Sequence, residues 1–307
     1  MRSLAFILIG LVAHAALGSM FSKDPISIKN NFVYGYLSTV GFQLATKIRQ
    51  AEEEPFKLSP KQEPSMEPSS RIVEGFAAKL GDFPYQAGLI ADVTGGLSVC
   101  GGSLLNERRV LTAAHCWHDG QQQARGFVVV LGSLTLFSGG IRIQTSKVVM
   151  HNKYNPVTKR NDIAMIYLSK TIRFSNIISP IALPSRKDVN KNFVGDTAIA
   201  SGFGLTRDGE KLHSKTFLSF VKLKVISNSQ CRQGFQIVRR SNICSKGVRG
   251  ENVCGGDSGG PLVITRRKKR ILIGVTSFGT TRRCQNSLPS AFTRVTSYID
   301  WINNLLS

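Results

Sequence analysis

Long hydrophobic runs are scarce in this chain. The apolar run near the start, from Leu4 to Val12, is shorter than the about 20 residues that a membrane-spanning helix needs. Arg2 before the run and small residues after it are typical of a secretory signal peptide, which we expect to cover residues 1–18. No later segment is apolar for long enough to span a bilayer. The sequence therefore predicts a secreted, extracellular protein without a membrane anchor.

Close pairs of metal-ligating residues are also missing. The cysteines stand at positions 100, 116, 231, 244, 254 and 284, and none forms the Cys-x-x-Cys pair that is typical of zinc sites. In a secreted chain, six cysteines predict a disulfide framework instead. Spacing alone leaves fifteen pairings open.

Acidic residues are few. The chain has 40 Lys and Arg against 19 Asp and Glu, a net charge of +21, and basic residues cluster at 239–240, 266–270 and 282–283. Such a field attracts polyanions or acidic protein surfaces, but the pattern of ITRRKKRIL favours the alternative of solvated hairpin tips. Nucleic-acid binding as the main function is disfavoured because no aromatic-rich basic motif accompanies the charge.

The pattern along the chain indicates three parts. Residues 19–71 have apolar residues at helix-like spacing in the middle, followed by a stretch with four prolines that should be extended and open to proteases. From Ile72 onward, short runs rich in Val, Ile, Leu and Thr alternate with Gly, Asn, Asp and Pro, which predicts many short strands. From Val295 the apolar spacing becomes helical. The body is therefore expected to be all-β with one C-terminal helix.

Three motifs carry residues for nucleophilic catalysis. LTAAHC contains His115, NDIAMIYL contains Asp162, and CGGDSGGP places Ser258 between glycines. A serine hydroxyl needs a base to take its proton and a carboxylate to orient that base. Each residue alone has an ordinary structural interpretation. Together, in the order His, Asp, Ser, they predict a catalytic triad.

With these motifs, RIVEG after residue 70 and SFG at 277–279, residues 72–307 resemble a chymotrypsin-family serine protease. The resemblance implies an all-β fold of two six-stranded antiparallel Greek-key barrels, with the active site between them and a C-terminal α-helix. Residues 19–71 are similar to activation propeptides of insect chymotrypsin-like zymogens, which suggests a digestive role. Residues 120–161 contain no Asp or Glu for the calcium loop of many relatives, so no metal or other cofactor is expected.

The resemblance also assigns roles. Ser258 would attack a peptide carbonyl to form an acyl-enzyme, His115 would transfer the proton, and Asp162 would orient the imidazole. The backbone amides of Gly256 and Ser258 would form the oxyanion hole. The implied disulfides are Cys100–Cys116, Cys231–Cys244 and Cys254–Cys284.

Activation is expected to depend on a cut after Arg71. In the family, the freed amino group, here that of Ile72, pairs with the Asp before the catalytic serine, here Asp257. A buried ion pair that is half-made is unfavourable, so the new N-terminus acts as a switch.

The resemblance places Asn252 at the floor of the specificity pocket, with Ser277, Phe278, Gly279 and Ser290 around it. Asn252 is neutral, so a trypsin-like pocket is not expected. The predicted preference is for aromatic or large apolar residues before the cleaved bond, with an elastase-like preference as the alternative. Such an enzyme should not cut its own precursor efficiently, and an external trypsin-like protease is expected to activate it.

Two classes of function remain at this point. The first is a secreted serine endopeptidase, expected to be a monomer, that acts on protein or peptide substrates. The second is a polyanion-binding protein on a protease scaffold with little catalysis. The presence of all three triad residues favours the first, because function is read from the site and not from the fold.

Overall fold

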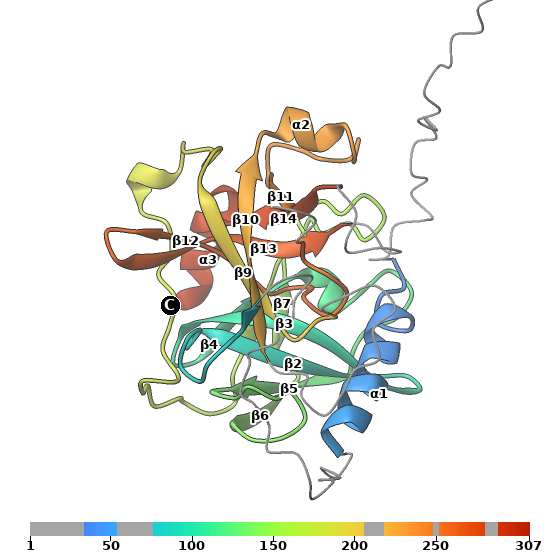
Figure 1. Ribbon diagram of the computed structural model, residues 1–307. Helices are drawn as coiled ribbons and strands as arrows, with labels where there is room; N and C mark the ends of the chain where they lie inside the picture. The colour runs from blue at the N-terminus through green and yellow to red at the C-terminus, as the bar shows by residue number, and fades with distance from the viewer. Residues whose placement is uncertain (1–33, 54–75, 206–217, 248–251, 280–287) are drawn as a thin grey trace, which may run out of the picture.

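The computed structural model describes residues 34–53, 76–205, 218–247, 252–279 and 288–307 (Figure 1). The expected signal peptide, the expected cut between Arg71 and Ile72, and Cys284 lie outside these residues. The described body consists of two antiparallel β-barrels with few helices, as the sequence predicts.

The first barrel contains the strands β2 (Gln86–Val93), β3 (Gly96–Asn106), β4 (Arg109–Thr112), β5 (Gly126–Leu131), β6 (Ile141–Thr145), β7 (Val148–Met150) and β8 (Ala164–Tyr167). Their order in the sheet is β6-β5-β2-β3-β4-β8-β7. The two edge strands, β6 and β7, are separated by only residues 146–147 in the chain. Because this bent segment pairs with β5 at one end and with β8 at the other, it serves as the sixth strand and closes the sheet on itself.

The second barrel contains β9 (Thr197–Gly202), β10 (Ser219–Ile226), β11 (Asn242–Gly247), β12 (Pro261–Arg266), β13 (Lys269–Phe278) and β14 (Ser290–Arg294). Pairing of β10 with β9 closes these six strands into a ring, and the short β1 (Phe76–Ala77) adds to β10. In β10, Val221, Leu223 and Val225 are buried while Lys222 and Lys224 are exposed. This period of two places one face of the strand in the barrel core.

The helices are α1 (Val40–Glu53), η2 (Ala114–Cys116), η3 (Arg186–Asp188), α2 (Asn228–Arg232), η4 (Val295–Tyr298) and α3 (Ile299–Leu306). The expected C-terminal helix therefore begins as a 3-10 turn and becomes α-helical at Ile299. Its Ile302 is fully buried, and Arg109 of the first barrel donates a hydrogen bond from Nε to the Leu305 carbonyl at 2.7 Å. The end of the chain thus links the second barrel, which it follows, to the first.

The helix α1 comes from the segment that precedes the body, and it lies against the first barrel (Figure 1). Its buried face includes Leu44, Ala45 and Ile48, which are spaced as the helical pattern in the sequence predicts. This face packs mainly on β3. Within the described residues, no helix is long and apolar enough to cross a membrane.

Candidate active site

His115 and Asp162 form a buried pair at the junction of the barrels. His115 lies in η2, directly after β4, and Asp162 precedes β8, which pairs with β4. The His115 Nδ1 atom is 2.8 Å from Asp162 Oδ2, and the backbone N–H of His115 donates to Asp162 Oδ1 at 2.9 Å. Both side chains are fully buried. The carboxylate therefore fixes the imidazole through two independent contacts.

The second barrel completes the surroundings of Asp162. The Ser277 hydroxyl donates to Asp162 Oδ2 at 2.5 Å, and Thr293 Oγ1 donates to the Asp162 carbonyl at 2.7 Å. Burial raises the pKa of Asp162, but the contact with His115 and the hydrogen bond from Ser277 outweigh it and hold this pKa below its ordinary value. The carboxyl is thus kept ionised. Ser277 and Thr293 were not assigned this role from the sequence, because β13 and β14 meet Asp162 only in the folded chain.

Ser258 lies at the same junction, in a tight loop whose geometry requires glycine on both sides of it. Gly256 has a φ of +96°, and a Cβ there would lie 2.7 Å from the Cα of Gly204. A Cβ at Gly259, where φ is +80°, would lie 2.5 Å from the Gly101 carbonyl. This close approach lets the backbone N–H of Gly101 donate to the Ser258 carbonyl at 2.7 Å. The buried Ser258 is thereby held against the barrel that carries His115.

Tyr36, from the segment before α1, lies against both His115 and the Ser258 loop. Its ring meets that of His115 edge-on with centroids 5.3 Å apart, and its hydroxyl donates to the Val99 carbonyl at 2.8 Å. The Ser258 hydroxyl and the backbone N–H of Gly256 also hydrogen-bond the Tyr36 hydroxyl. Burial raises the pKa of Tyr36, although these two contacts oppose the shift. In the described part of the chain, His115 Nε2 has no hydrogen-bond partner. Nothing in the sequence singled out Tyr36.

Asp257 is buried behind the Ser258 loop. Its carboxylate accepts hydrogen bonds from the backbone N–H groups of Gly204 and Cys254, both at 3.0 Å. No ion pair to Asp257 is present among the residues that the structure describes. Burial raises the pKa of Asp257 to about 6, even though the two backbone hydrogen bonds act in the opposite direction. The expected partner, the amino group of Ile72, lies outside the described residues.

The predicted pocket residues lie close together but use their side chains differently. Asn252 is buried and neutral: Ser290 Oγ donates to Asn252 Oδ1 at 2.6 Å, and Asn252 Nδ2 donates to the Leu288 carbonyl at 2.9 Å. Gly279 faces the Ser290 hydroxyl.

Two of the predicted pocket residues direct their side chains elsewhere. The Ser277 hydroxyl bonds Asp162, and the Phe278 ring packs edge-on against Phe235 with centroids 5.7 Å apart. The side chains of Ser277 and Phe278 are therefore both engaged within the protein.

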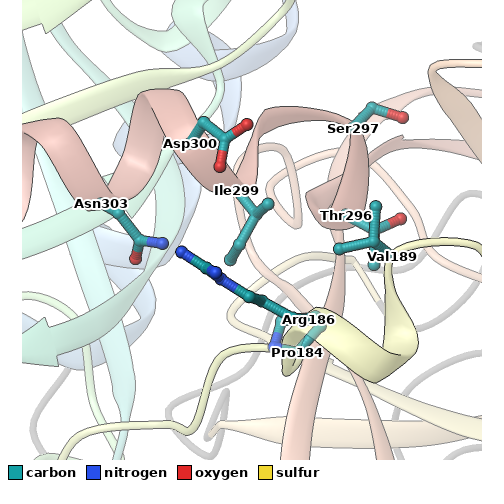
Figure 2. A pocket seen from close by; sticks show the side chains of 8 residues that line it. All are labelled: Pro184, Arg186, Val189, Thr296, Ser297, Ile299, Asp300 and Asn303. Atoms are coloured by element: carbon teal, nitrogen blue, oxygen red, sulfur yellow. The ribbon is translucent and has the colours of Figure 1, made fainter.

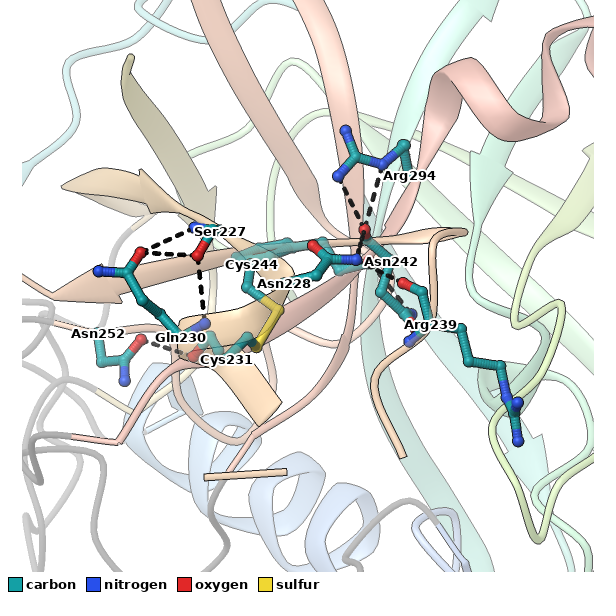
Figure 3. Close-up of a disulfide and its surroundings, with 11 residues drawn as sticks. Ser227, Asn228, Gln230, Cys231, Arg239, Asn242, Cys244, Asn252 and Arg294 are labelled. Atoms are coloured by element: carbon teal, nitrogen blue, oxygen red, sulfur yellow. Dashed lines mark hydrogen bonds between the residues drawn. A yellow bond between two sulfur atoms is a disulfide. The ribbon is translucent and has the colours of Figure 1, made fainter. Parts of the chain in front are cut away.

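Two disulfides support the site. Cys100–Cys116 ties β3 to η2 directly beside His115, and Cys231–Cys244 ties α2 to β11 (Figure 3). Both are the pairs that the family resemblance implies. Cys254 is also disulfide-bonded, and its expected partner, Cys284, lies outside the described residues. Cys100, Cys116 and His115 are close enough to hold a metal ion, but the two sulfurs are bonded to each other and are not available as ligands.

A surface pocket lies between η3 and the C-terminal helix (Figure 2). It is lined by Pro184, Arg186, Val189, Thr296, Ser297, Ile299, Asp300 and Asn303. None of the residues predicted to be catalytic or to bind substrate lines it. The residues predicted to be catalytic lie elsewhere, at the barrel junction.

The basic cluster at 266–270 forms the turn between β12 and β13. Arg266 pairs with Asp196 at 2.8 Å, and Arg270 donates to the Asp82 carbonyl and lies over the Phe83 ring. The three residues between them, 267–269, are exposed at the tip. The cluster thus matches the hairpin expected from the sequence, with part of its charge neutralised by acidic neighbours.

Two antiparallel barrels with a His–Asp pair beside a buried serine define the class of trypsin-like serine proteases. Comparison with known proteins agrees. Residues 72–302 match the family model described as Trypsin. The collagenase of Hypoderma lineatum is 38% identical over 235 residues, covering 76% of this chain and 86% of that protein. The chain belongs to the trypsin family and is a serine protease.

Two further relatives extend this result. The chymotrypsin of Phaedon cochleariae is 36% identical over 272 residues, covering 87% of this chain and 94% of that protein. This alignment is longer than the body from Ile72 onward, so the similarity continues into the preceding segment. The solved structure of HL collagenase superposes with a TM-score of 0.69 at 36% identity, covering 76% of this chain and 98% of that one.

Proposed function

We propose that this chain is the secreted zymogen of a serine endopeptidase that is activated by a cut after Arg71 and prefers aromatic or large apolar residues before the cleaved bond. The observation that carries the proposal is the buried His115–Asp162 pair, 2.8 Å apart, beside the buried Ser258. Acyl transfer by serine requires this set of groups.

In the proposed mechanism, Ser258 Oγ attacks the peptide carbonyl carbon and its proton passes to His115 Nε2. The tetrahedral intermediate collapses to an acyl-enzyme as His115 returns the proton to the leaving amine, and water then hydrolyses the ester. Asp162 holds the imidazole through Nδ1 and stabilises its charged form. The amides of Gly256 and Ser258 stabilise the oxyanion, and each such donor is typically worth about 3 kcal/mol in the transition state.

Asp257 supports the proposed activation step. Its carboxyl is buried and has a raised pKa, and among the described residues it accepts hydrogen bonds from two backbone N–H groups and forms no ion pair. A cationic amino group arriving beside it, such as that of Ile72 after the cut, would stabilise its charged form. The paired Asp257 would then hold the loop that contains Ser258 and Gly256 in its active geometry.

The neutral Asn252 supports a preference other than Lys or Arg. Its amide is already bonded to Ser290 and to the Leu288 carbonyl, so the pocket floor offers no negative charge to a basic side chain. Gly279 leaves room for a large side chain, while Ser290 narrows the pocket slightly. An elastase-like preference is the alternative. Arg71 does not suit this pocket, so activation would need an external trypsin-like protease.

The test begins with the purified precursor. Incubated alone it should stay intact, whereas a trypsin-like protease should cut after Arg71 and produce activity. Rapid self-conversion that is absent in Ser258→Ala would contradict the external activator. Profiling of the activated enzyme on a peptide library then separates a chymotrypsin-like preference from an elastase-like one. The mature N-terminus of protein recovered from the culture medium tests secretion.

The rival function, binding of polyanions by the basic surface with little catalysis, predicts a different result. A serine-directed phosphonate should then fail to label Ser258 in the activated chain. Binding to immobilised heparin in a salt gradient measures the polyanion contribution separately. If this binding is specific, substitution of the exposed tip at 267–269 by serine should lower the salt concentration needed for elution.

A further inference from the structure

We propose that the active-site cleft is a binding surface for residues 34–53 of the same chain, and that this segment remains bound as an inhibitor after the peptide bond between Arg71 and Ile72 is cut. The inference rests on the proposed function, because inhibition has meaning only for an active protease. It adds a second step to the proposed activation, because cleavage after Arg71 and release of residues 34–53 become separate events.

One side chain of the segment contacts three parts of the expected catalytic machinery. The Tyr36 hydroxyl is hydrogen-bonded by the Ser258 hydroxyl and by the Gly256 N–H, which the mechanism needs for the nucleophile and the oxyanion. The Tyr36 ring lies edge-on against His115. The phenol thus stands where a substrate carbonyl would have to bind. Tyr36 itself is fully buried, so substrate and segment cannot occupy the cleft together.

The turn that carries Tyr36 is anchored to the loop that follows His115. The backbone N–H of Leu37 donates to Asp119 Oδ2 at 2.8 Å, and that of Gly35 donates to the Asp119 carbonyl at 3.4 Å. Leu37 and Asp119 are both fully buried. A buried carboxylate that accepts a backbone N–H is a specific contact, because removal of the donor would leave one of its hydrogen bonds unmade. The segment is therefore fixed in position on both sides of Tyr36.

The other end of the segment is anchored as well. Glu52, in the last turn of α1, accepts hydrogen bonds from the backbone N–H groups of Leu136 at 2.7 Å and Phe137 at 2.9 Å, and from the Ser138 hydroxyl at 3.0 Å. These donors belong to a loop of the first barrel between β5 and β6. The segment thus spans from the catalytic junction to the loop between β5 and β6.

The middle of the segment packs closely on the barrel and on the Ser258 loop. Gly41 lies so near Ser98 of β3 that an added Cβ would overlap the Ser98 hydroxyl. Leu44 lies over Gly255 and Gly256, at the base of the expected oxyanion hole. Apolar burial along this face adds to the polar anchors at its two ends.

These contacts do not depend on an intact bond after Arg71. They all lie between residues 34 and 53, whereas the cut is eighteen residues beyond Glu53. The first cysteine of the chain is Cys100, so the cleaved segment has no disulfide to the body and is held by non-covalent contacts alone. Its release is then governed by concentration, by competition with substrate, or by further cuts in α1. Lys47 and Arg49, both exposed on α1, offer sites for a trypsin-like protease.

The test uses the full chain with residues 67–71 replaced by Asp-Asp-Asp-Asp-Lys, so that enteropeptidase cuts before Ile72 and leaves α1 intact. Hydrolysis of a small ester is measured directly after the cut and again after gel filtration under mild denaturation and refolding of the separated body. We expect the cut complex to co-elute and to have roughly 100-fold lower activity than the separated enzyme, a ratio that corresponds to about 2.7 kcal/mol of coupling. Adding back the released fragment should restore inhibition, competitively with substrate.

Variants of the fragment define the contact. Tyr36→Phe removes the hydroxyl together with its hydrogen bonds and should weaken inhibition roughly tenfold. The lost hydrogen bonds together correspond to a change in affinity of about tenfold or more. Tyr36→Ala should weaken it further. Gly41→Leu should prevent docking through the clash with Ser98 while the body stays unchanged. Gln43→Ala, on the exposed side of α1, is the matched control and should inhibit like the parent fragment.

Three results would overturn the inference. The first is full ester hydrolysis while the fragment still co-elutes, and the second is equal inhibition by the Tyr36→Ala fragment and the parent. Loss of the fragment during the cut, with no binding on add-back, would overturn it as well. Failure of the proposed function has a different signature, namely no hydrolysis and no phosphonate labelling of Ser258 after separation. In that case, fluorescence anisotropy of the labelled fragment still measures docking, and no dependence on Tyr36 in that assay would refute the contact.

Discussion

The uncut chain should become less stable as the pH rises from about 4 to about 6, because of Asp257. Burial raises the pKa of this carboxyl from 3.8 to about 6, so the folded chain binds the proton more tightly than the unfolded chain does. The perturbation that isolates this effect is Asp257→Asn, which keeps the size of the side chain and removes the titration. Both proteins would carry Ser258→Ala to prevent proteolysis.

The magnitude follows from linkage. A pKa difference of one unit corresponds to 1.36 kcal/mol, so the shift of about two units amounts to about 3 kcal/mol. Below pH 4 both states of Asp257 are protonated, and the contribution to stability is fully present. Between pH 4 and 6 the unfolded chain loses its proton first, so the free energy of unfolding falls. Above pH 6 both states are ionised and the decline ends.

The assay is urea unfolding of the two proteins at pH 4, 5, 6 and 7, with the difference in free energy of unfolding taken at each pH. The contributions of the other titrating groups cancel in this difference. Taken as the protein with Asp257 minus the Asp257→Asn variant, the difference in free energy of unfolding should fall by about 3 kcal/mol across this range. A difference that is constant, or that rises with pH, would refute the reasoning for the uncut chain. After the cut, pairing with the new N-terminus should lower the pKa of Asp257 and abolish the decline.

Three further predictions concern the activated enzyme. Ser277→Ala removes the donor to Asp162 and should lower kcat roughly tenfold with KM unchanged, measured by ester hydrolysis; an unaltered kcat would show that this hydrogen bond does not position the carboxylate. Asn252→Asp should add cleavage after Lys and Arg in a peptide-library profile, and an unchanged profile would exclude Asn252 from the pocket floor. Replacing Cys231 and Cys244 together by alanine should lower the free energy of unfolding in urea by about 3 kcal/mol, whereas no loss would show that the closed loop does not constrain the unfolded chain.

The order of the motifs was enough to predict that His115 and Asp162 would meet. They lie 47 positions apart in the chain, yet β4 and β8 pair directly, and each of the two residues is next to one of these strands. Strands in the body could be predicted because apolar residues such as Val221 and Leu223 alternate with lysines. These features are local, or they come from motifs with a fixed chemical purpose.

Contacts between residues that are distant in the chain could not be predicted from the sequence. Ser277 was expected near the substrate, and the hydrogen bond from its hydroxyl to Asp162 was not predicted; Ser277 lies where the register of β13 and β14 shifts. Tyr36 was one of several apolar residues at helical spacing, and its role depends on Asp119 and Glu52 docking the segment across the cleft. A tyrosine has no sequence signal for binding in an oxyanion hole. Such placements follow from packing between distant parts of the chain.

The hydrogen bond from Arg109 to the Leu305 carbonyl has a consequence for biosynthesis. Arg109 leaves the ribosome long before Leu305, so the first barrel is synthesised well before this contact can form. Domains generally fold from the N-terminus as they are made. Here the Arg109–Leu305 contact can form only when the final residues emerge. A chain that ends a few residues early keeps both barrels and the contacts at their junction, but it lacks this link between the first barrel and the C-terminal helix.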